Sequence, residues 1–178
     1  MGGRDKGLLP FGGGLLVDHV LSAIRPQVSG VLISANRNQD HYRRLGFPVL
    51  SDSLDGFQGP LAGLLAGLEN MHTDYLLTLP CDGPAILPNL AERLAKALWQ
   101  TDARIAAAHD GGRLQPLYAL HHREVLPDLR AALEAGERKV ERWVTSNRWA
   151  QVDFSDAPEQ FANLNTPDDY QRAAGAVL

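Results

Sequence analysis

The sequence predicts an α/β protein of the three-layer, Rossmann-like kind, with helices on both faces of a mostly parallel sheet. Segments with helical spacing alternate along the chain with short apolar runs. The runs Val31–Ser34 and Tyr75–Leu79 lack strict apolar–polar alternation, which is typical of strands covered on both faces. The chain has 178 residues and shows no linker, repeat or low-complexity tract. We therefore expect one domain, residues 1–178.

In the first half of the chain, Leu15–Ile24 is expected to be a helix. Leu16, Val20 and Ile24 recur every four residues, and Pro26 would end the helix. The next expected elements are strands at Gly30–Ser34 and Phe47–Leu50, a helix at Leu61–Leu68 and a strand at Tyr75–Leu79.

In the second half, Leu90, Leu94 and Leu98 form one apolar stripe of a helix, and Thr166 is a suitable N-cap for another. The elements expected here are a helix at Leu87–Leu98, a hairpin of strands Arg104–Ala108 and Leu114–Leu120, helices at Val125–Ala135 and Arg138–Thr145, a strand at Trp149–Phe154 and a closing helix at Pro167–Ala176.

Composition excludes several classes of protein. The formal net charge is −4, which argues against non-specific nucleic-acid binding. The only cysteine, Cys81, excludes an internal disulfide and a thiolate-rich zinc cage, and we expect it to be a small buried residue at a strand end. No apolar run is long enough to span a membrane, and the start of the chain does not resemble a signal peptide. We therefore predict a cytoplasmic protein without membrane partners.

The chain opens on a glycine-rich loop, Met1-Gly2-Gly3-Arg4-Asp5-Lys6-Gly7. A doubly wound domain normally begins with a central strand, and its phosphate-binding loop follows that strand. The expectation is that this sequence starts inside the domain and that the first strand is missing. The neighbouring strands would then have open edges, so poor solubility or self-association is expected.

The strand Tyr75–Leu79 runs into Pro80-Cys81-Asp82-Gly83-Pro84. Open α/β sheets bind ligands outside the carboxyl ends of their strands, and a carboxylate there can hold a hydrated Mg²⁺ against phosphates. Asp82 could equally well serve only to turn the chain, together with Gly83 and Pro84. The residues alone leave both interpretations open.

Other polar residues also follow expected strands or begin expected helices. Lys6 could offset phosphate charge, or it could belong to a solvated terminus. Asp52 and Ser34 could contact a nucleotide, or they could be ordinary turn and loop residues. The remaining candidates are Arg138 and Lys139, which could meet an anion or form a solvated face, and Asn163 and Asn165, which could contact a ligand or cap the closing helix.

In their order along the chain, these segments resemble the MobA family, the molybdenum cofactor guanylyltransferases. The resemblance covers essentially the whole chain. It is carried by Met1–Lys6, Asp18–Val20, Ala35–Arg37, Asp52–Leu54, Gly59–Gly63, Pro80–Asp82, Ala135–Arg138, Val152–Asp156 and Asn163–Pro167. It implies a three-layer nucleotidyltransferase fold that normally opens with a strand and a glycine-rich turn, both of which are absent before Met1.

The resemblance also implies roles for individual residues. Lys6 would contact the GTP phosphates, Asp82 would bind Mg²⁺, and Asp52 would contact GTP. The residues implied for the molybdopterin side are Arg138, Lys139, Asn163 and Asn165. Ser34 stands where a guanine-contacting asparagine is expected, which weakens the case for guanine over cytosine.

The implied reaction is Mg²⁺-dependent transfer of GMP from GTP to molybdopterin, with release of pyrophosphate. The partners would be GTP, the molybdenum cofactor, and other cofactor-biosynthesis or molybdoenzyme-specific proteins. The alternatives are a cytidylyltransferase for the same cofactor, another nucleotidyltransferase, and a non-catalytic domain that binds molybdopterin or a partner.

Overall fold

The computed structural model describes residues 5–52, 59–162 and 164. The α-helices are α1 (Leu16–Ile24), α2 (Gln39–Arg43), α3 (Pro60–Asn70), α4 (Leu90–Gln100), α5 (Leu126–Glu134) and α6 (Val140–Thr145). The strands are β1 (Pro10–Phe11), β2 (Gly14–Leu15), β3 (Ile33–Ser34), β4 (Val49–Leu50), β5 (Tyr75–Thr78), β6 (Ile105–His109), β7 (Leu114–His122) and β8 (Trp149–Asp153). Short 3₁₀ helices at Lys6–Leu8, Arg25–Gln27, Arg123–Val125 and Pro158–Phe161 join several of them.

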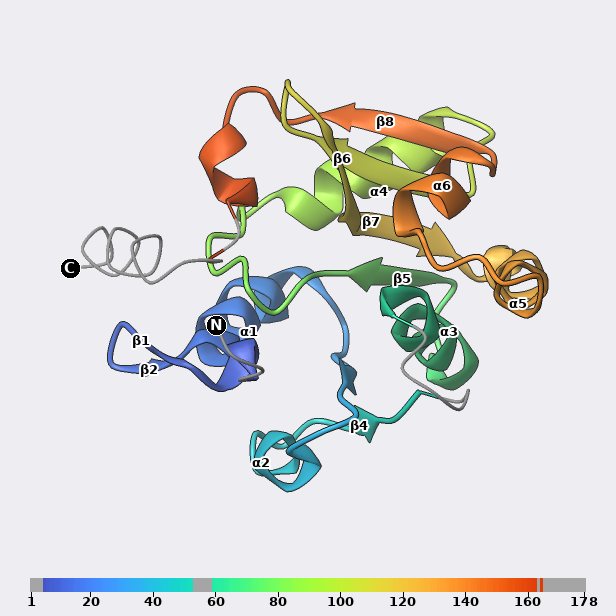
Figure 1. Ribbon diagram of the computed structural model, residues 1–178. Helices are drawn as coiled ribbons and strands as arrows, with labels where there is room; N and C mark the ends of the chain where they lie inside the picture. The colour runs from blue at the N-terminus through green and yellow to red at the C-terminus, as the bar shows by residue number, and fades with distance from the viewer. Residues whose placement is uncertain (1–4, 53–58, 163, 165–178) are drawn as a thin grey trace.

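The largest sheet in the described part has four strands in the order β5-β7-β6-β8 (Figure 1). β7 is antiparallel to both β5 and β6, while β8 is parallel to β6. Three of the four strands therefore run in one direction and β7 runs against them. The sheet is mixed, and the α/β class expected from the sequence is confirmed.

Helices cover both faces of this sheet, and the side chains of β6 show how. Ile105 and Ala107 pack with α3, α5 and α6, whereas Ala106 and Ala108 pack with α1 and α4. All four side chains are completely buried. Successive residues of a strand point to opposite faces, so β6 belongs to two apolar cores at once. The result is the three-layer arrangement that the sequence predicts (Figure 1).

A second, two-stranded parallel sheet is formed by β3 and β4, with Ile33 opposite Val49 and Ser34 opposite Leu50. Helix α3 connects this two-stranded sheet to β5 along the chain. The first turns of α3 lie beside the end of β3, where Gly63 faces Ser34, and the chain leaves the far end of α3 to start β5. The three strands β3, β4 and β5 therefore run in the same direction, antiparallel to α3.

Most expected elements are confirmed, and the differences have local causes. Helix α4 begins at Leu90 rather than Leu87, since Pro88 disfavours helical backbone at the residue before it. The side chain of Gln27 accepts a hydrogen bond from Ala91 N at this new start, at 3.1 Å. The small hairpin of β1 and β2 and the helix α2 are found in the structure but were not expected from the sequence. The predicted closing helix, Pro167–Ala176, lies outside the described residues.

Two further expectations can be compared with the structure. Cys81 is exposed, so the prediction of a buried residue is wrong; the chain has already left β5 and entered a surface turn there. Within the ranges described above, no helix combines the length and the apolar character that crossing a membrane requires.

Candidate functional site

The two residues predicted to act together, Lys6 and Asp82, are in contact. Lys6 Nζ lies 2.7 Å from Asp82 Oδ2, although 76 positions separate them in the sequence. Asp82 follows the end of β5, and Lys6 begins the first 3₁₀ helix. The Asp82 side chain keeps 14% of its surface exposed and the Lys6 side chain 34%, so both remain accessible from outside. The fold thus presents a cation and a carboxylate together at a strand end.

The loop that carries Lys6 is fixed by the residue before it. Asp5 accepts hydrogen bonds from the Tyr42 hydroxyl at 2.7 Å and from Asn38 Nδ2 at 3.1 Å. Burial and the Asp5 contact raise the pKa of Tyr42 far above its usual value, so its hydroxyl keeps its proton. Gly7 is also required, because a Cβ atom there would lie 2.7 Å from the same hydroxyl. Helix α2, which was not expected from the sequence, therefore positions Lys6 indirectly.

Asp52 and Ser34 lie at the ends of the two-stranded sheet, as predicted. Asp52 Oδ2 accepts a 2.6 Å hydrogen bond from Asn36 Nδ2, and Asn36 Oδ1 accepts one from Asp52 N at 2.9 Å. Ser34 is exposed, and its Oγ would lie 2.7 Å from a Cβ placed on Gly63 of α3. The small residue on α3 thus lets the helix approach this polar edge closely.

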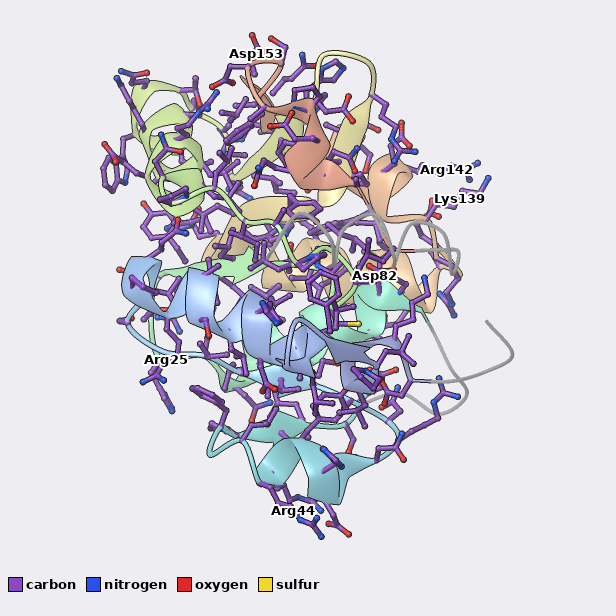
Figure 2. All side chains as sticks on the ribbon, turned by 90° about the vertical axis from the view of Figure 1, so that its left-hand side faces the viewer. Arg25, Arg44, Asp82, Lys139, Arg142 and Asp153 are labelled. Carbon is purple, nitrogen blue, oxygen red and sulfur yellow. The ribbon has the colours of Figure 1, made fainter. Side chains whose placement is uncertain are left out.

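The ends of β3, β4 and β5 face the same edge of the molecule because these strands run in one direction. Polar side chains from all three strand ends therefore gather there: Ser34 and Asn36 after β3, Asp52 after β4 and Asp82 after β5. This is the edge where open α/β sheets bind ligands. Figure 2 shows Asp82 near the middle of the face turned toward the viewer.

The pair Arg138 and Lys139 separates into two environments. Arg138 Nη1 donates to the carbonyl oxygens of Leu133 at 2.9 Å and Glu137 at 2.7 Å, which ties it to the end of α5. The backbone amides of Arg138 and Lys139 both donate to the Glu137 carboxylate. These hydrogen bonds hold the pKa of Glu137 below its usual value. The start of α6 is thus already occupied by an acid of the chain itself.

Lys139 instead faces a surface hollow of about 530 Å³, which it lines together with Arg142 and with Pro116 and Leu117 of β7. Figure 2 shows Lys139 and Arg142 at the right-hand edge of the view, above and to the right of Asp82. Thr78 of β5 is opposite Ala119 of β7, and the two strands are antiparallel. Asp82, after Thr78, and Pro116, before Ala119, therefore both lie toward the same end of the sheet. Lys139 therefore belongs to the same end of the sheet as Asp82.

Asn163 and Asn165 lie outside the described residues. Leu164, between them in the sequence, is buried, and its amide donates to the carbonyl oxygen of Asp82 at 3.0 Å. This contact attaches that part of the chain to the turn after β5.

One residue near Asp82 was missed from the sequence. Tyr118 of β7 is 2% exposed, and no partner for its buried hydroxyl is found among the described residues. Burial first, and then the charge of Asp82, raise the pKa of Tyr118 well above its usual value. In the sequence, Tyr118 has the pattern of an apolar strand residue. Only the pairing of β7 with β5 shows that Tyr118 lies near Asp82.

The donor set can be tested against a metal ion. No cluster of three or more His, Cys, Asp or Glu side chains that could hold a metal occurs among the residues the structure describes. Asp82 therefore offers a single carboxylate. This fits Mg²⁺, which commonly keeps several waters and binds through one or two carboxylates together with substrate phosphates. It does not fit a structural zinc site, which needs four protein ligands.

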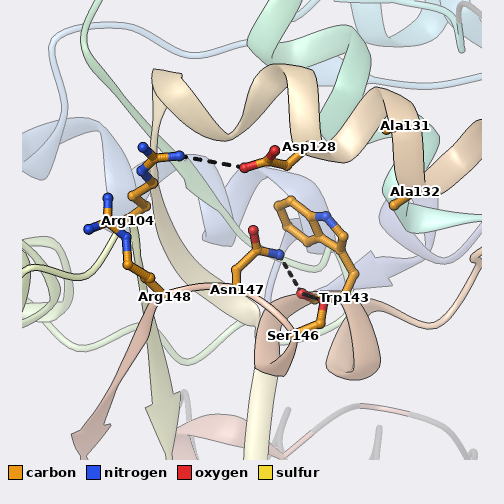
Figure 3. A pocket seen from close by; sticks show the side chains of 8 residues that line it. All are labelled: Arg104, Asp128, Ala131, Ala132, Trp143, Ser146, Asn147 and Arg148. Atoms are coloured by element: carbon orange, nitrogen blue, oxygen red, sulfur yellow. Dashed lines mark hydrogen bonds and ion pairs between the residues drawn. The ribbon is translucent and has the colours of Figure 1, made fainter.

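A different hollow, of about 410 Å³, lies at the opposite end of the sheet (Figure 3). Arg104 and Arg148 lie just before the first residues of β6 and β8, and Asp128 and Trp143 complete its walls from α5 and α6. Asp128 forms an ion pair with Arg104 at 3.5 Å. None of the residues predicted to be functional lines this hollow.

Comparison with known proteins shows which family this chain belongs to. The family model described as "MobA-like NTP transferase domain" matches residues 1–152. The protein named molybdenum cofactor guanylyltransferase from Shewanella sp. (strain MR-4) is 44% identical over 177 residues, 99% of this chain and 90% of its own length. The protein of the same name from Vibrio campbellii is 46% identical over 169 residues, 95% of this chain and 86% of its own length.

Among solved structures, molybdopterin-guanine dinucleotide biosynthesis protein A from Archaeoglobus fulgidus aligns with a TM-score of 0.80 at 22% identity, covering 98% of this chain and 91% of its own. The 2-C-methyl-D-erythritol 4-phosphate cytidylyltransferase of Thermus thermophilus aligns with a TM-score of 0.75 at 18% identity, covering 96% and 93%. At these identities the two structures support the fold alone. With the family model and the curated relatives, they show that this chain belongs to the MobA family of nucleotidyltransferases.

Proposed function

We propose that this chain is a molybdenum cofactor guanylyltransferase, which transfers GMP from GTP to the molybdopterin form of the cofactor and releases pyrophosphate. Two curated relatives with that name are 44% and 46% identical to it. The single structural observation that carries the proposal is the 2.7 Å contact between Lys6 and Asp82 at the end of β5. A cation beside a metal-binding carboxylate is what polyphosphate chemistry requires.

In the proposed reaction, a terminal phosphate oxygen of molybdopterin attacks the α-phosphorus of GTP. The bond from the α-phosphorus to the bridging oxygen of the β-phosphate breaks, and pyrophosphate leaves with that oxygen. No covalent intermediate with the protein is needed, so the chain contributes position and charge. Lys6 would neutralise negative charge on the departing pyrophosphate, in a loop that Asp5 holds through Tyr42 and Asn38.

The metal that we propose is Mg²⁺, held by Asp82 and by the phosphates of the substrate. When bound, it would draw charge away from the phosphate oxygens and orient them. In the structure, Lys6 compensates the charge of the Asp82 carboxylate.

The nucleoside end of GTP would lie over the ends of β3 and β4. There, Ser34 and the Asn36–Asp52 pair present hydroxyl, amide and carboxylate groups to a base or a ribose. The molybdopterin phosphate would approach from the hollow that Lys139 and Arg142 line. Arg138 would shape this side by fixing the turn after α5, and Asn163 and Asn165 are the remaining residues we propose for the pterin.

The decisive experiment compares carboxamide variants at the two ends of β5. Asp82→Asn keeps the size of the side chain but removes the charge, so we expect transfer of GMP to fall by about a hundredfold or more. Asp74→Asn is the matched control: Asp74 precedes β5, and its side chain makes a 3.6 Å surface ion pair with Arg123. That variant should retain wild-type turnover, since it changes only the side chain, keeps the hydrogen bond from Arg123 N to the Asp74 carbonyl oxygen, and loses an exposed ion pair of the kind that contributes little.

Circular dichroism and thermal unfolding would show that both variants are folded. Wild-type turnover in a folded Asp82→Asn protein would remove Asp82 from the mechanism. A separate competition of GTP against CTP, with molybdopterin as acceptor, tests the nucleotide. Preferred use of CTP would identify a cytidylyltransferase, while failure to bind either nucleotide with Mg²⁺ at millimolar concentration would favour a non-catalytic binding domain.

A further inference from the structure

The hollow at the end of the sheet remote from Asp82 has the size of a small-molecule site. Its volume of about 410 Å³ falls within the range of known ligand pockets. The starts of β6 and β8 form one side of it, and α5 and the end of α6 form the rest (Figure 3). The proposed reaction uses none of these residues, so their chemistry needs a separate explanation.

Two arginines stand next to each other on one side of this hollow. Ile105 is opposite Trp149 in the parallel pair of β6 and β8, so the residues before them, Arg104 and Arg148, are also opposite each other. Arg104 N donates to Arg148 O at 2.7 Å, which fixes this arrangement. Like charges at opposite positions of neighbouring strands repel each other. A carboxylate that accepts hydrogen bonds from both guanidinium groups would relieve the repulsion.

The acids around the two arginines limit the kind of ligand. Glu124 and Asp102 hold Arg104 and Arg148 from outside the wall of the hollow, Glu124 at 3.5 Å from Arg104 Nε. Asp128 lies in the wall itself, with its Oδ2 3.5 Å from Arg104 Nη1. With three acids around two arginines, a simple anion gains little from the local charge. The hollow instead presents a cation and an anion side by side, which suits a ligand that carries both charges.

Two buried donors in the wall of the hollow lack an acceptor among the described residues. These are Arg104 Nε and Nε1 of Trp143, whose side chain is only 2% exposed. The contacts of Arg104 with the two acids are too long to be good hydrogen bonds. Buried donors in native proteins nearly always have a partner. Two unpaired donors in one hollow therefore indicate a ligand that brings acceptor oxygens.

The rest of the wall offers an acceptor and an apolar surface. Asn147 Nδ2 donates to the carbonyl oxygen of Trp143 at 2.6 Å, which fixes the amide group. Figure 3 shows the amide oxygen of Asn147 on the side of Asp128, so the two side chains can accept hydrogen bonds from one ammonium group. Ala131 and Ala132 of α5 are small, and with the indole ring they leave room for an apolar side chain.

We infer that this hollow binds a free α-amino acid with an apolar side chain. The carboxylate lies between Arg104 and Arg148, and the ammonium group contacts Asp128 and Asn147. The side chain packs on Trp143 and the two alanines of α5. In an α-amino acid a single carbon separates the two charged groups, which matches the neighbouring opposite charges of Arg104 and Asp128. This inference does not depend on the proposed reaction.

The test is a titration of the full chain at pH 7, followed by the indole N–H signals of its tryptophans in heteronuclear NMR. The probe is L-leucine, and two matched compounds each lack one charge: isoamylamine has no carboxylate and isocaproate has no ammonium group. We expect leucine to shift the Trp143 signal saturably and to leave that of Trp99, which is 71% exposed, in place. Both matched compounds should bind at least about tenfold more weakly, because each loses charge-assisted hydrogen bonds.

Two carboxamide variants separate the inner acid from an outer one. Asp128→Asn keeps the shape of the hollow and removes the charge that faces the ammonium group, so leucine should bind at least about tenfold more weakly. Asp102→Asn is the matched control, because Asp102 contacts Arg148 from outside and is 88% exposed. Its affinity for leucine should stay within about twofold of the wild type. Circular dichroism would show that both variants are folded.

Each other outcome overturns the inference. The absence of a saturable Trp143 shift at high millimolar leucine would show that no amino acid binds. Isocaproate binding as well as leucine would make the hollow a simple anion site, and equal binding of isoamylamine would remove the arginines from recognition. Unchanged affinity in a folded Asp128→Asn protein would contradict the assigned orientation. Because the readout is binding and not transfer of GMP, these results are independent of those for Asp82.

Discussion

His121 Nε2 lies 3.2 Å from Oγ1 of Thr78, between the neighbouring strands β7 and β5 of the four-stranded sheet. The His121 side chain is completely buried, packs against the ring of Trp143 at 5.7 Å, and has no partner for Nδ1 among the described residues. A proton on this ring would be a charge in an apolar core. Burial accordingly lowers the pKa of His121 from 6.5 to about 3.

This burial predicts an acid-sensitive fold. In the unfolded chain His121 binds a proton below about pH 6.5, while in the native protein it does not until about pH 3. The contribution of His121 to stability is therefore complete above pH 6.5 and is lost as the pH falls through this window. The loss amounts to about 1.4 kcal/mol per pH unit. Urea unfolding at pH 7.5 and 4.5 should show it.

The variant His121→Gln isolates this effect, because other titrating groups act equally in both proteins. We expect its loss of stability between the two pH values to be smaller than that of the wild type by about 2 to 3 kcal/mol. His122→Gln is the control, since the side chain of the neighbouring His122 is partly exposed rather than buried. Equal pH dependence in all three proteins would show that His121 does not control acid unfolding.

The contact between Lys6 and Asp82 predicts that removing the charge of Lys6 lowers activity much more than stability. Lys6→Met keeps the length of the side chain and removes its charge, so transfer should fall by about a hundredfold or more if Lys6 offsets charge on pyrophosphate. The free energy of unfolding should change by less than about 1 kcal/mol, because the pair is partly exposed and screened. Lys6→Arg should recover part of the activity. Activity lost only in proportion to a large loss of stability would contradict this role.

The sequence predicts the elements that follow from local periodicity well. The stripe Leu90, Leu94 and Leu98 is buried as expected, and the two strands around Gly111 form the predicted hairpin. The resemblance to the MobA family also implies one site for Lys6 and Asp82, and the structure brings the two side chains into contact. Helix α2 was missed because its five residues bury only Tyr42, too few positions for a periodic signal.

The environment of the site depends on contacts that are distant in sequence. The place of Tyr118 beside Asp82 follows from the register of β7 on β5, which no local pattern encodes. The exposure of Cys81 depends on where β5 ends, and strand boundaries are the least certain part of a sequence-based prediction. Arg138 donates to carbonyl oxygens at the end of α5, whereas Lys139 lines a surface hollow. Two adjacent cations in the sequence do not show which of them will find acceptors in the fold.

The turn of the hairpin predicts a specific requirement for glycine. Gly111 has φ = +92°, and a Cβ atom there would lie 2.8 Å from Ser155 Cβ. Gly111→Ala should therefore cost about 1 to 3 kcal/mol of unfolding free energy. At Gly112 the nearest atom would be Asp110 Oδ1 at 3.4 Å, and Gly112→Ala should cost clearly less. Denaturant midpoints of the two variants compare adjacent positions of one turn, and equal midpoints would contradict the argument.

Removing the hydroxyl oxygen should have opposite effects on stability at two buried tyrosines, Tyr118 and Tyr42. The Tyr118 hydroxyl has no partner among the described residues, so Tyr118→Phe should raise the free energy of unfolding by about 1 kcal/mol. The ring would keep its edge contact with Phe161, whose centroid is 4.9 Å away. The Tyr42 hydroxyl donates to Asp5 at 2.7 Å, so Tyr42→Phe should lower stability by about 1 to 3 kcal/mol. Urea titrations of both variants measure the difference. A Tyr118→Phe protein as destabilised as Tyr42→Phe would show that the Tyr118 hydroxyl is hydrogen-bonded in solution.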